Sequence, residues 1–281
     1  MNTASLLAAL AGLLYLAAGF TLARAFVINR ARVRTTGIVL AGLALVAHAG
    51  FAWLKVNSDL GWDVNFINVL SLAGLLVALV LLLTGLGTRS LEAGVLVFPG
   101  VAVLVWLQWL SKPAPMFLDH MPAMLQFHIL TALLAFSLLA LAAANAILLW
   151  IQDYLLRTPR PISQLELLPP LIVLEQLMFR LIMAGWVLLT LALAAGLTFV
   201  YDLLSQHLMH KTVLSVISWL LFGLLLGARW WLGWRGRRAV NWTLVAMVFL
   251  VLAYFGSRFV LELLLDRTWS RMALAATSGL A

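Results

Sequence analysis

Residues 66–87 read FINVLSLAGLLVALVLLLTGLG, an apolar run without a charged side chain. A helix over this stretch would be about 33 Å long, because an α-helix rises about 1.5 Å per residue, and that length crosses the hydrocarbon core of a bilayer. Further segments of the same character lie at residues 4–26, 37–54, 93–111, 122–150, 179–200, 212–232 and 241–264. The sequence therefore predicts an all-α fold, a polytopic integral membrane helix bundle with about eight transmembrane helices.

The composition of the whole chain agrees with this prediction. Of its 281 residues, 64% are hydrophobic and 10% are charged, whereas a soluble domain usually carries about 25% charged residues. The mean hydropathy is +1.08. No polar block is long enough for a separate soluble domain, so we expect residues 1–281 to form a single transmembrane domain. The chain has no cysteine, which excludes disulfides, thiolate catalysis, iron–sulfur clusters and cysteine-bound zinc.

The positions of lysine and arginine indicate how the helices are oriented, because positively charged loops stay on the cytoplasmic side. The loops after the first, third, fifth and seventh segments contain Arg24, Arg30, Arg32, Arg34, Arg89, Arg157, Arg160, Arg229, Arg235, Arg237 and Arg238. The opposite side contains fewer, namely Lys55, Lys112, Lys211, Arg267 and Arg271. We expect the arginine-rich loops in the cytoplasm and both termini outside. The net charge of +8 then reflects topology, and we expect no nucleic-acid partner.

The longest connection between apolar segments covers residues 151–178. It contains four prolines, and after the last of them LIVLEQLMF, residues 171–179, leads into the sixth apolar segment. Two interpretations of residues 171–179 remain open. It forms either a short helix that lies in the membrane interface or the first turns of the next, tilted span.

Three polar side chains are expected in one layer of the membrane. His48, His128 and Arg258 each lie six residues from the expected outer end of their span, about 9 Å below the outer face. Further polar side chains in the outer half that are candidates for the same layer are Asn68, Ser71, Gln108 and Gln126. Ionisable residues in lipid are costly, so each one is a candidate functional residue.

Two imidazoles and a guanidinium are suited to binding an amphiphilic metal porphyrin. Neutral histidine nitrogens ligate the iron axially, and arginine pairs with a propionate carboxylate. Structural explanations also remain open. An intramembrane histidine often forms hydrogen bonds between helices, and Arg258 has an acid, Glu262, four residues later that is able to neutralise it.

Motifs of common enzymes are missing from the sequence. It contains no P-loop, no G-x-S-x-G, no H-E-x-x-H and no pair of carboxylates within a span. We therefore expect a protein that is not an enzyme and that has no metal site beyond haem iron.

Two segments resemble the cytochrome c assembly (CcsA/HemX) superfamily, in particular its YpjD-type inner-membrane branch. They are Gly233–Ala239, GWRGRRA, and Leu252–Ser257, LAYFGS. The resemblance extends over a core of about residues 37–265. It implies a multi-pass bundle that handles haem in the bacterial cytoplasmic (inner) membrane. It also implies that His128 matches an outward-facing haem ligand and His48 a membrane-embedded one.

The chain departs from the CcsA-type members of that family at two places. Their outer loop before the seventh span is rich in tryptophan and presents haem, whereas residues 201–211 here contain no tryptophan. Gly227 stands where a partner histidine is expected. The resemblance therefore implies haem binding without implying haem transfer to cytochrome c.

The leading functional hypothesis is a non-enzymatic, haem-binding membrane protein with His48 and His128 as axial ligands. Its partners would be membrane lipid, haem and other cytochrome c biogenesis or tetrapyrrole-pathway proteins. The alternative is a regulatory or interaction protein without tight haem binding, which would contact its partner through residues 151–178. A transporter would need polar residues across both leaflets, and the expected polar layer lies only in the outer half.

Overall fold

The computed structural model of the chain describes residues 2–28, 31–58, 61–85, 89–111, 123–157, 171–197 and 209–256. Within these ranges, eight helices are long and apolar enough to cross a membrane. In chain order they are α1 (Thr3–Ile28), α2 (Ala31–Val56), α3 (Phe66–Gly85), α4 (Gly94–Leu110), α5 (Ala123–Arg157), α7 (Leu171–Leu197), α9 (Met209–Trp231) and α10 (Arg237–Val251). The predicted all-α, eight-span fold is confirmed.

Four short elements accompany the long helices. Strands β1 (Asn57–Ser58) and β2 (Gly61–Trp62) form an antiparallel pair between α2 and α3. A 3₁₀ helix, η1 (Arg89–Ala93), precedes α4, and a π-helical turn, η2 (Leu252–Gly256), follows α10.

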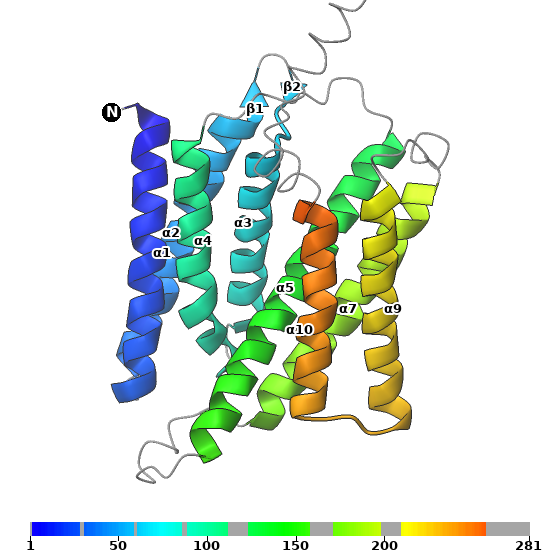
Figure 1. The fold of residues 1–281 in the computed structure, drawn as a ribbon. Helices are drawn as coiled ribbons and strands as arrows, with labels where there is room; N and C mark the ends of the chain where they lie inside the picture. The colour runs from blue at the N-terminus through cyan, green and yellow to red at the C-terminus, as the bar shows by residue number, and fades with distance from the viewer. Residues whose placement is uncertain are drawn as a thin grey trace, which may run out of the picture.

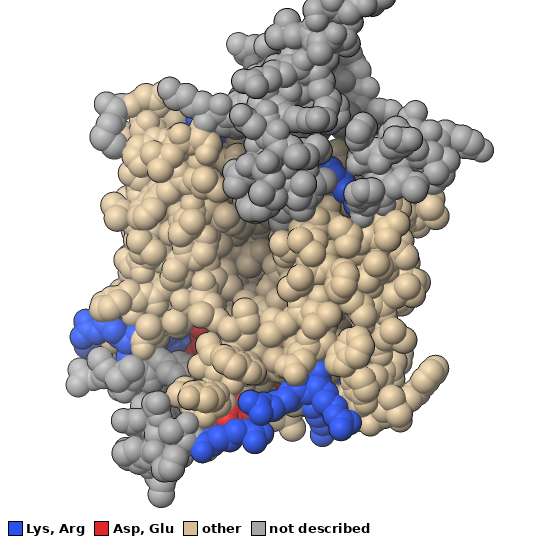
Figure 2. All heavy atoms as spheres, in the orientation of Figure 1, with Lys and Arg blue, Asp and Glu red and all other residues tan. Residues whose placement is uncertain are grey.

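The helices form two groups that stand side by side (Figure 1). In the first group α1 packs on α2 and α4, and α3 packs on both as well. In the second group α5 packs on α7 and α10, and α9 packs on the same two helices. Helices α3 and α5 join the two groups, and the surface is hollowed between the groups on the face shown in Figure 2.

Small residues allow the helices to approach closely, as is usual where helices meet inside a membrane. Ala11 of α1 and Ala44 of α2 are fully buried. The indole of Trp106 on α4 lies where a Cβ on Gly12 of α1 would be. The depth of burial differs greatly between spans, since 72% of the residues in the apolar window of α5 are buried and only 22% in that of α9. Helix α5 is therefore central, and α9 lies at the periphery.

Residues 171–179 form the first turns of α7, which resolves the two interpretations left open for this segment. The helix is continuous from Leu171 to Leu197. Leu174, Met178 and Ile182 are fully buried and follow one another at intervals of four residues. The apolar stripe of the span therefore begins in the connecting segment itself, and residues 171–179 form no separate interfacial helix.

Arginine side chains gather at one end of the bundle, where α1, α5 and α9 end and α2, α7 and α10 begin (Figure 2). This placement agrees with the loops that the sequence assigns to a common side. The side of the membrane on which this end lies stays a prediction, as does the position of both termini.

Candidate functional site

His48 forms a hydrogen-bonded junction between the helices of the first group. Its side chain is fully buried on α2. The ring Nε2 lies 2.9 Å from the hydroxyl of Ser71 on α3, and Nδ1 lies 3.4 Å from the hydroxyl of Tyr15 on α1. The ring of Tyr15 in turn stacks on Phe98 of α4. Both imidazole nitrogens therefore have partners, three helices meet at this side chain, and α4 packs on its partner Tyr15.

The amides of Asn68 and Gln108 extend the polar layer toward the hairpin end of the bundle. Gln108 Nε2 donates to Asn68 Oδ1 at 2.9 Å, and Asn68 Nδ2 donates to the carbonyl of Asp63 at 2.9 Å. The backbone N–H of Asn68 donates to Asn65 Oδ1 at 3.0 Å. This last contact makes Asn65 the N-cap of α3.

Tyr15, Asp63 and Asn65 belong to this layer but were not predicted from the sequence. An Asp-x-Asn sequence directly before an apolar run is a helix-start signal. A tyrosine inside a span usually needs a hydrogen-bond partner for its hydroxyl. The first signal would have identified Asp63 and Asn65 from the sequence, and the second would have identified Tyr15.

His128 lies on α5, and its ring is hydrogen-bonded to α7, within the second helix group. Its Nδ1 lies 2.7 Å from the carbonyl oxygen of Ala192. A carbonyl oxygen only accepts hydrogen bonds, so Nδ1 carries the proton and the lone pair of the neutral ring lies on Nε2. Among the described residues Nε2 has no hydrogen-bond partner, and the side chain is half-buried. The ring is therefore held in place with a ligating nitrogen still available.

The two histidines lie in different helix groups, and no described contact joins them. The structure brings His48 together with Ser71, and Asn68 together with Gln108. Gln126 is exposed on α5 and lines a cavity of about 550 Å³ between α2, α3 and α5, together with Trp53, Trp62 and Leu130. Neither His48 nor His128 is part of that lining.

Arg258 and Glu262 lie outside the described residues. Their predicted pairing with each other or with a propionate therefore stays a prediction from the sequence.

Buried polar side chains also occur in the half of the bundle nearer the arginine-rich end. Asn145 is fully buried on α5, and Gln152, two turns further along the same helix, is 1% exposed. The expectation that buried polar residues are confined to the other half is therefore wrong. Spans that are apolar on every side give no sequence signal for an interior amide.

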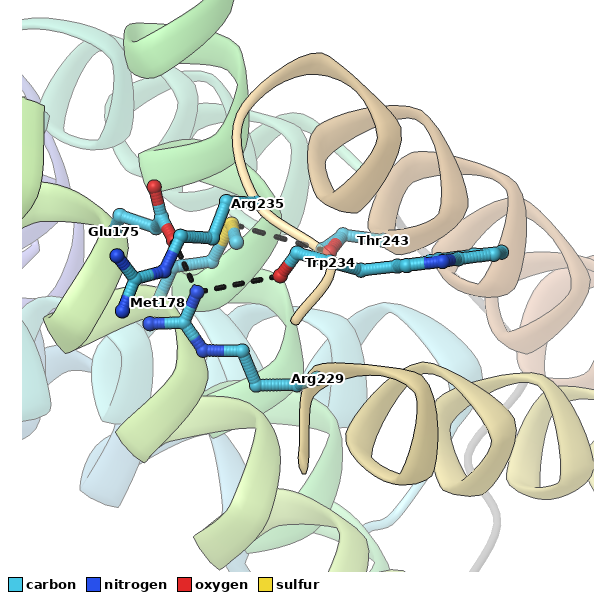
Figure 3. A network of polar contacts seen from close by, with 6 residues as sticks. All are labelled: Glu175, Met178, Arg229, Trp234, Arg235 and Thr243. Carbon is cyan, nitrogen blue, oxygen red and sulfur yellow. Dashed lines mark hydrogen bonds and ion pairs between the residues drawn. The ribbon is translucent and has the colours of Figure 1, made fainter. Parts of the chain in front are cut away.

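A network of polar contacts closes the arginine-rich end between α7 and the turn that joins α9 to α10 (Figure 3). Arg229 Nη1 donates to Glu175 Oε1 at 2.6 Å and to the carbonyl of Trp234 at 3.2 Å. Its guanidinium lies 4.5 Å from the centroid of the Phe179 ring, and Arg235 Nε lies 4.0 Å from the same carboxylate oxygen. Buried charges need such partners because an unpaired charge is costly away from water.

The turn itself depends on glycine. Gly233 and Gly236 have φ angles of +64° and +60°, a region that only glycine adopts readily. The sequence motif that carries the family resemblance therefore has a local structural function, since it lets the chain reverse between α9 and α10. The pairing of Glu175 with Arg229 was not predicted, and nothing in the sequence links residues that are 54 positions apart.

Comparisons with known proteins agree with the resemblance. The family model described as "Cytochrome C assembly protein" matches residues 10–265. The chain is 34% identical to the inner membrane protein YpjD of Escherichia coli strain K12 over 235 residues, which covers 82% of this chain and 88% of that protein. It is also 34% identical over 158 residues to an uncharacterized 28.8 kDa protein of Azospirillum brasilense, covering 55% and 58% of the two chains. No solved structure matches the chain significantly.

Proposed function

This chain belongs to the Cytochrome C assembly protein family, and from that premise we propose that it binds haem inside the inner membrane, with His128 as an axial ligand of the iron. The observation that supports this assignment is the anchoring of His128 on α7. Bound haem would supply the iron chemistry, and the chain would supply the ligand and an apolar environment without catalysing a reaction.

His128 has the features of a metal-binding histidine. Such residues usually donate their second ring N–H to a carbonyl or carboxylate, which fixes the tautomer and the ring orientation. The 2.7 Å contact to the carbonyl of Ala192 is of that kind. The ring also lies against Gly196, where even a methyl group would be close. The residues present therefore fit one axial ligand from α5.

His48 fits a second ligand position less well in the conformation described. Its Nε2 would have to leave the hydroxyl of Ser71 before it is able to bind iron. We propose that its first function is to hold α1, α2 and α3 together. The assignments of Arg258 and Glu262 to a propionate rest on the sequence alone.

Absorption spectra of the purified protein test this proposal. We expect a Soret band after purification in detergent from haem-replete cells, with most of it lost in His128→Ala. Free imidazole added to His128→Gly should restore the band, because it occupies the space of the missing side chain. Thr131→Val is the matched control one turn along α5, since its hydroxyl bonds only to carbonyls of its own helix.

Two results would count against this assignment. One is full haem occupancy in a folded His128→Ala protein. The other is a protein that purifies without haem from cells supplied with it. His48→Ala should reduce stability more than it reduces the Soret absorbance per folded molecule, and the reverse result would make His48 a ligand as well.

The second candidate is a regulatory or interaction protein that binds no haem tightly. The surplus of arginine at one end of the bundle favours this role, because such an end attracts acidic partners. The partner would be another cytochrome c biogenesis or tetrapyrrole-pathway protein that contacts residues 151–178, of which 158–170 lie outside the described residues. A crosslinked partner that is lost when this segment is replaced, in a protein without a Soret band, would select this candidate.

A further inference from the structure

An apolar groove of about 560 Å³ lies between α7, α9 and α10. Its lining contains Trp186, Trp219, Trp231, Trp234 and Trp242, and we call it the tryptophan groove. Helix α9 is the least buried span, because 22% of the residues in its apolar window are buried against 33% in that of α7. The groove therefore lies at the periphery of the bundle. It therefore faces the lipid, not the interior.

Two glycines of α9 give the groove its depth. Gly223 and Gly227 lie one helical turn apart and both line it. A Cβ on Gly227 would meet nothing within 4 Å, and a Cβ on Gly223 would come 3.2 Å from Trp186 Nε1. An extended hydrocarbon chain is able to lie directly against the backbone of the helix at Gly227, while the indole of Trp186 packs on Gly223.

The walls of the groove are fixed by hydrogen bonds that leave the aromatic faces apolar. Trp186 Nε1 donates to the carbonyl of Trp219 at 3.0 Å, and Trp219 Nε1 donates to the hydroxyl of Thr190 at 2.8 Å. The two rings stack with their centroids 5.6 Å apart. A site formed in advance loses little conformational entropy when a ligand enters.

The opposite wall is held by the network around Glu175. The carbonyl of Trp234 accepts a hydrogen bond from Arg229. The indole of Trp234 points away from Glu175, between the ribbons of α9 and α10 (Figure 3), and its ring is 5.9 Å from that of Trp242. The arginine-rich turn and the groove are therefore parts of one structure.

Positive charge is in excess at this end of the groove. Glu175 is already bonded to Arg229 at 2.6 Å, and Asp153 to Arg237 at 3.0 Å. The side chain of Arg235 is 67% exposed, and its Nε forms a longer ion pair of 4.0 Å with Glu175 Oε1. Arg238 is exposed as well, and among the described residues it has no ion-pair partner. Arg235 and Arg238 therefore carry exposed positive charge that the two carboxylates at this end do not neutralise.

We propose that the tryptophan groove binds an acyl chain of an anionic phospholipid whose phosphate is bound by Arg235 and Arg238. The groove alone would accept the acyl chain of any phospholipid, so selectivity for an anionic headgroup has to come from the two arginines. Guanidinium binds phosphate with paired hydrogen bonds, and each arginine near a membrane surface favours anionic over zwitterionic lipid. The spacing of Gly223 and Gly227 also suits contact with a second copy of the chain, which the experiment separates from lipid binding.

Native mass spectrometry of the full chain in detergent, titrated with phosphatidylglycerol or phosphatidylcholine, tests the proposal. The wild-type protein should bind one phosphatidylglycerol at least about tenfold more tightly than phosphatidylcholine. Gly227→Leu fills the groove, and the double variant Arg235→Gln/Arg238→Gln removes the headgroup contacts. Each should lower the affinity for phosphatidylglycerol by about tenfold or more, and the arginine variant should also abolish the preference over phosphatidylcholine.

Matched controls separate the groove from general effects. Gly100→Leu places the same side chain on α4 at a position where a Cβ also meets nothing within 4 Å. Arg24→Gln/Arg32→Gln removes two exposed arginines from the same end of the other helix group. Both controls should bind phosphatidylglycerol as the wild type does. Equal losses in controls and test variants would overturn the proposal, as would a Gly227→Leu protein that keeps its lipid affinity or changes only from dimer to monomer.

Discussion

Gly196 of α7 lies directly against the imidazole of His128 on α5. A Cβ at position 196 would come within 3.2 Å of ring atom Cε1 and 3.4 Å of Nδ1. The same ring is bonded through Nδ1 to the carbonyl of Ala192, one turn earlier on α7. The surface of α7 therefore fixes both the tautomer and the position of the histidine that we assign to the iron.

Gly196→Ala should lower haem occupancy severalfold although no ligand is removed. The added methyl group pushes the ring away from α7 by a few tenths of an ångström and lengthens its bond to Ala192, and small displacements of this kind weaken metal binding. The ratio of Soret to protein absorbance and the rate of haem loss to an apo-acceptor measure the effect. Gly100→Ala is the control, because its Cβ meets open space. Identical ratios in wild type and Gly196→Ala would contradict the assignment.

The fold was predictable because a segment in lipid must satisfy its own backbone hydrogen bonds. Length and hydropathy were enough to locate the eight spans, including the apolar run that begins at residue 66 and forms α3 (Phe66–Gly85). Side-to-side neighbours were not predictable, since spans that are apolar on every side show no periodicity that marks a packed face. Tyr15 reaches His48 across 33 positions of sequence, and no local pattern connects them.

The candidate site, too, was predictable only in part: the depth of its residues in the membrane was, and their lateral position was not. Depth in the membrane is a single coordinate that follows from the distance of a residue to the end of its span. His48 and His128 were assigned to one layer on that basis, but helices are also arranged in the membrane plane, and the structure places the two residues in separate groups. The two interpretations of residues 171–179 stayed open for a related reason, because the prolines at 169 and 170 mark the end of a connection but do not indicate how the next helix lies; the structure selects the first turns of α7.

Ser71→Ala should lower the stability of the first helix group by about 1 kcal/mol, since it removes the partner of His48 Nε2 from a buried site. Chemical unfolding in mixed detergent measures the change in free energy. Thr36→Ala is the control, because that hydroxyl bonds only to a carbonyl of its own helix at the exposed surface. Equal stability of Ser71→Ala and the wild type would show that the contact to His48 contributes nothing.

Glu175→Gln should destabilise the protein by about 2 kcal/mol. It leaves the guanidinium of Arg229, which is 18% exposed, without a carboxylate, and partial exposure keeps the effect below the 3–5 kcal/mol of a fully buried pair. Unfolding of single and double variants in detergent measures it. Glu175→Gln/Arg229→Gln should be less destabilised than the sum of the two single variants, because no buried charge remains. Strict additivity would mean that the two side chains do not interact.

Gly236→Ala should destabilise the turn between α9 and α10, whereas Gly227→Ala should not. Gly236 has φ +60° and ψ −136°, a conformation that costs a residue with a Cβ about 1–3 kcal/mol. Gly227 is helical and its Cβ would meet nothing within 4 Å, so alanine there should stabilise the helix by about 0.5–1 kcal/mol. The turn carries Trp234, whose carbonyl is bonded to Arg229, so Gly236→Ala should also shift the tryptophan emission. The free energy of unfolding and the tryptophan emission spectrum of both variants test this prediction. A change of the same sign in the free energy of unfolding of the two variants would refute the dependence on backbone conformation.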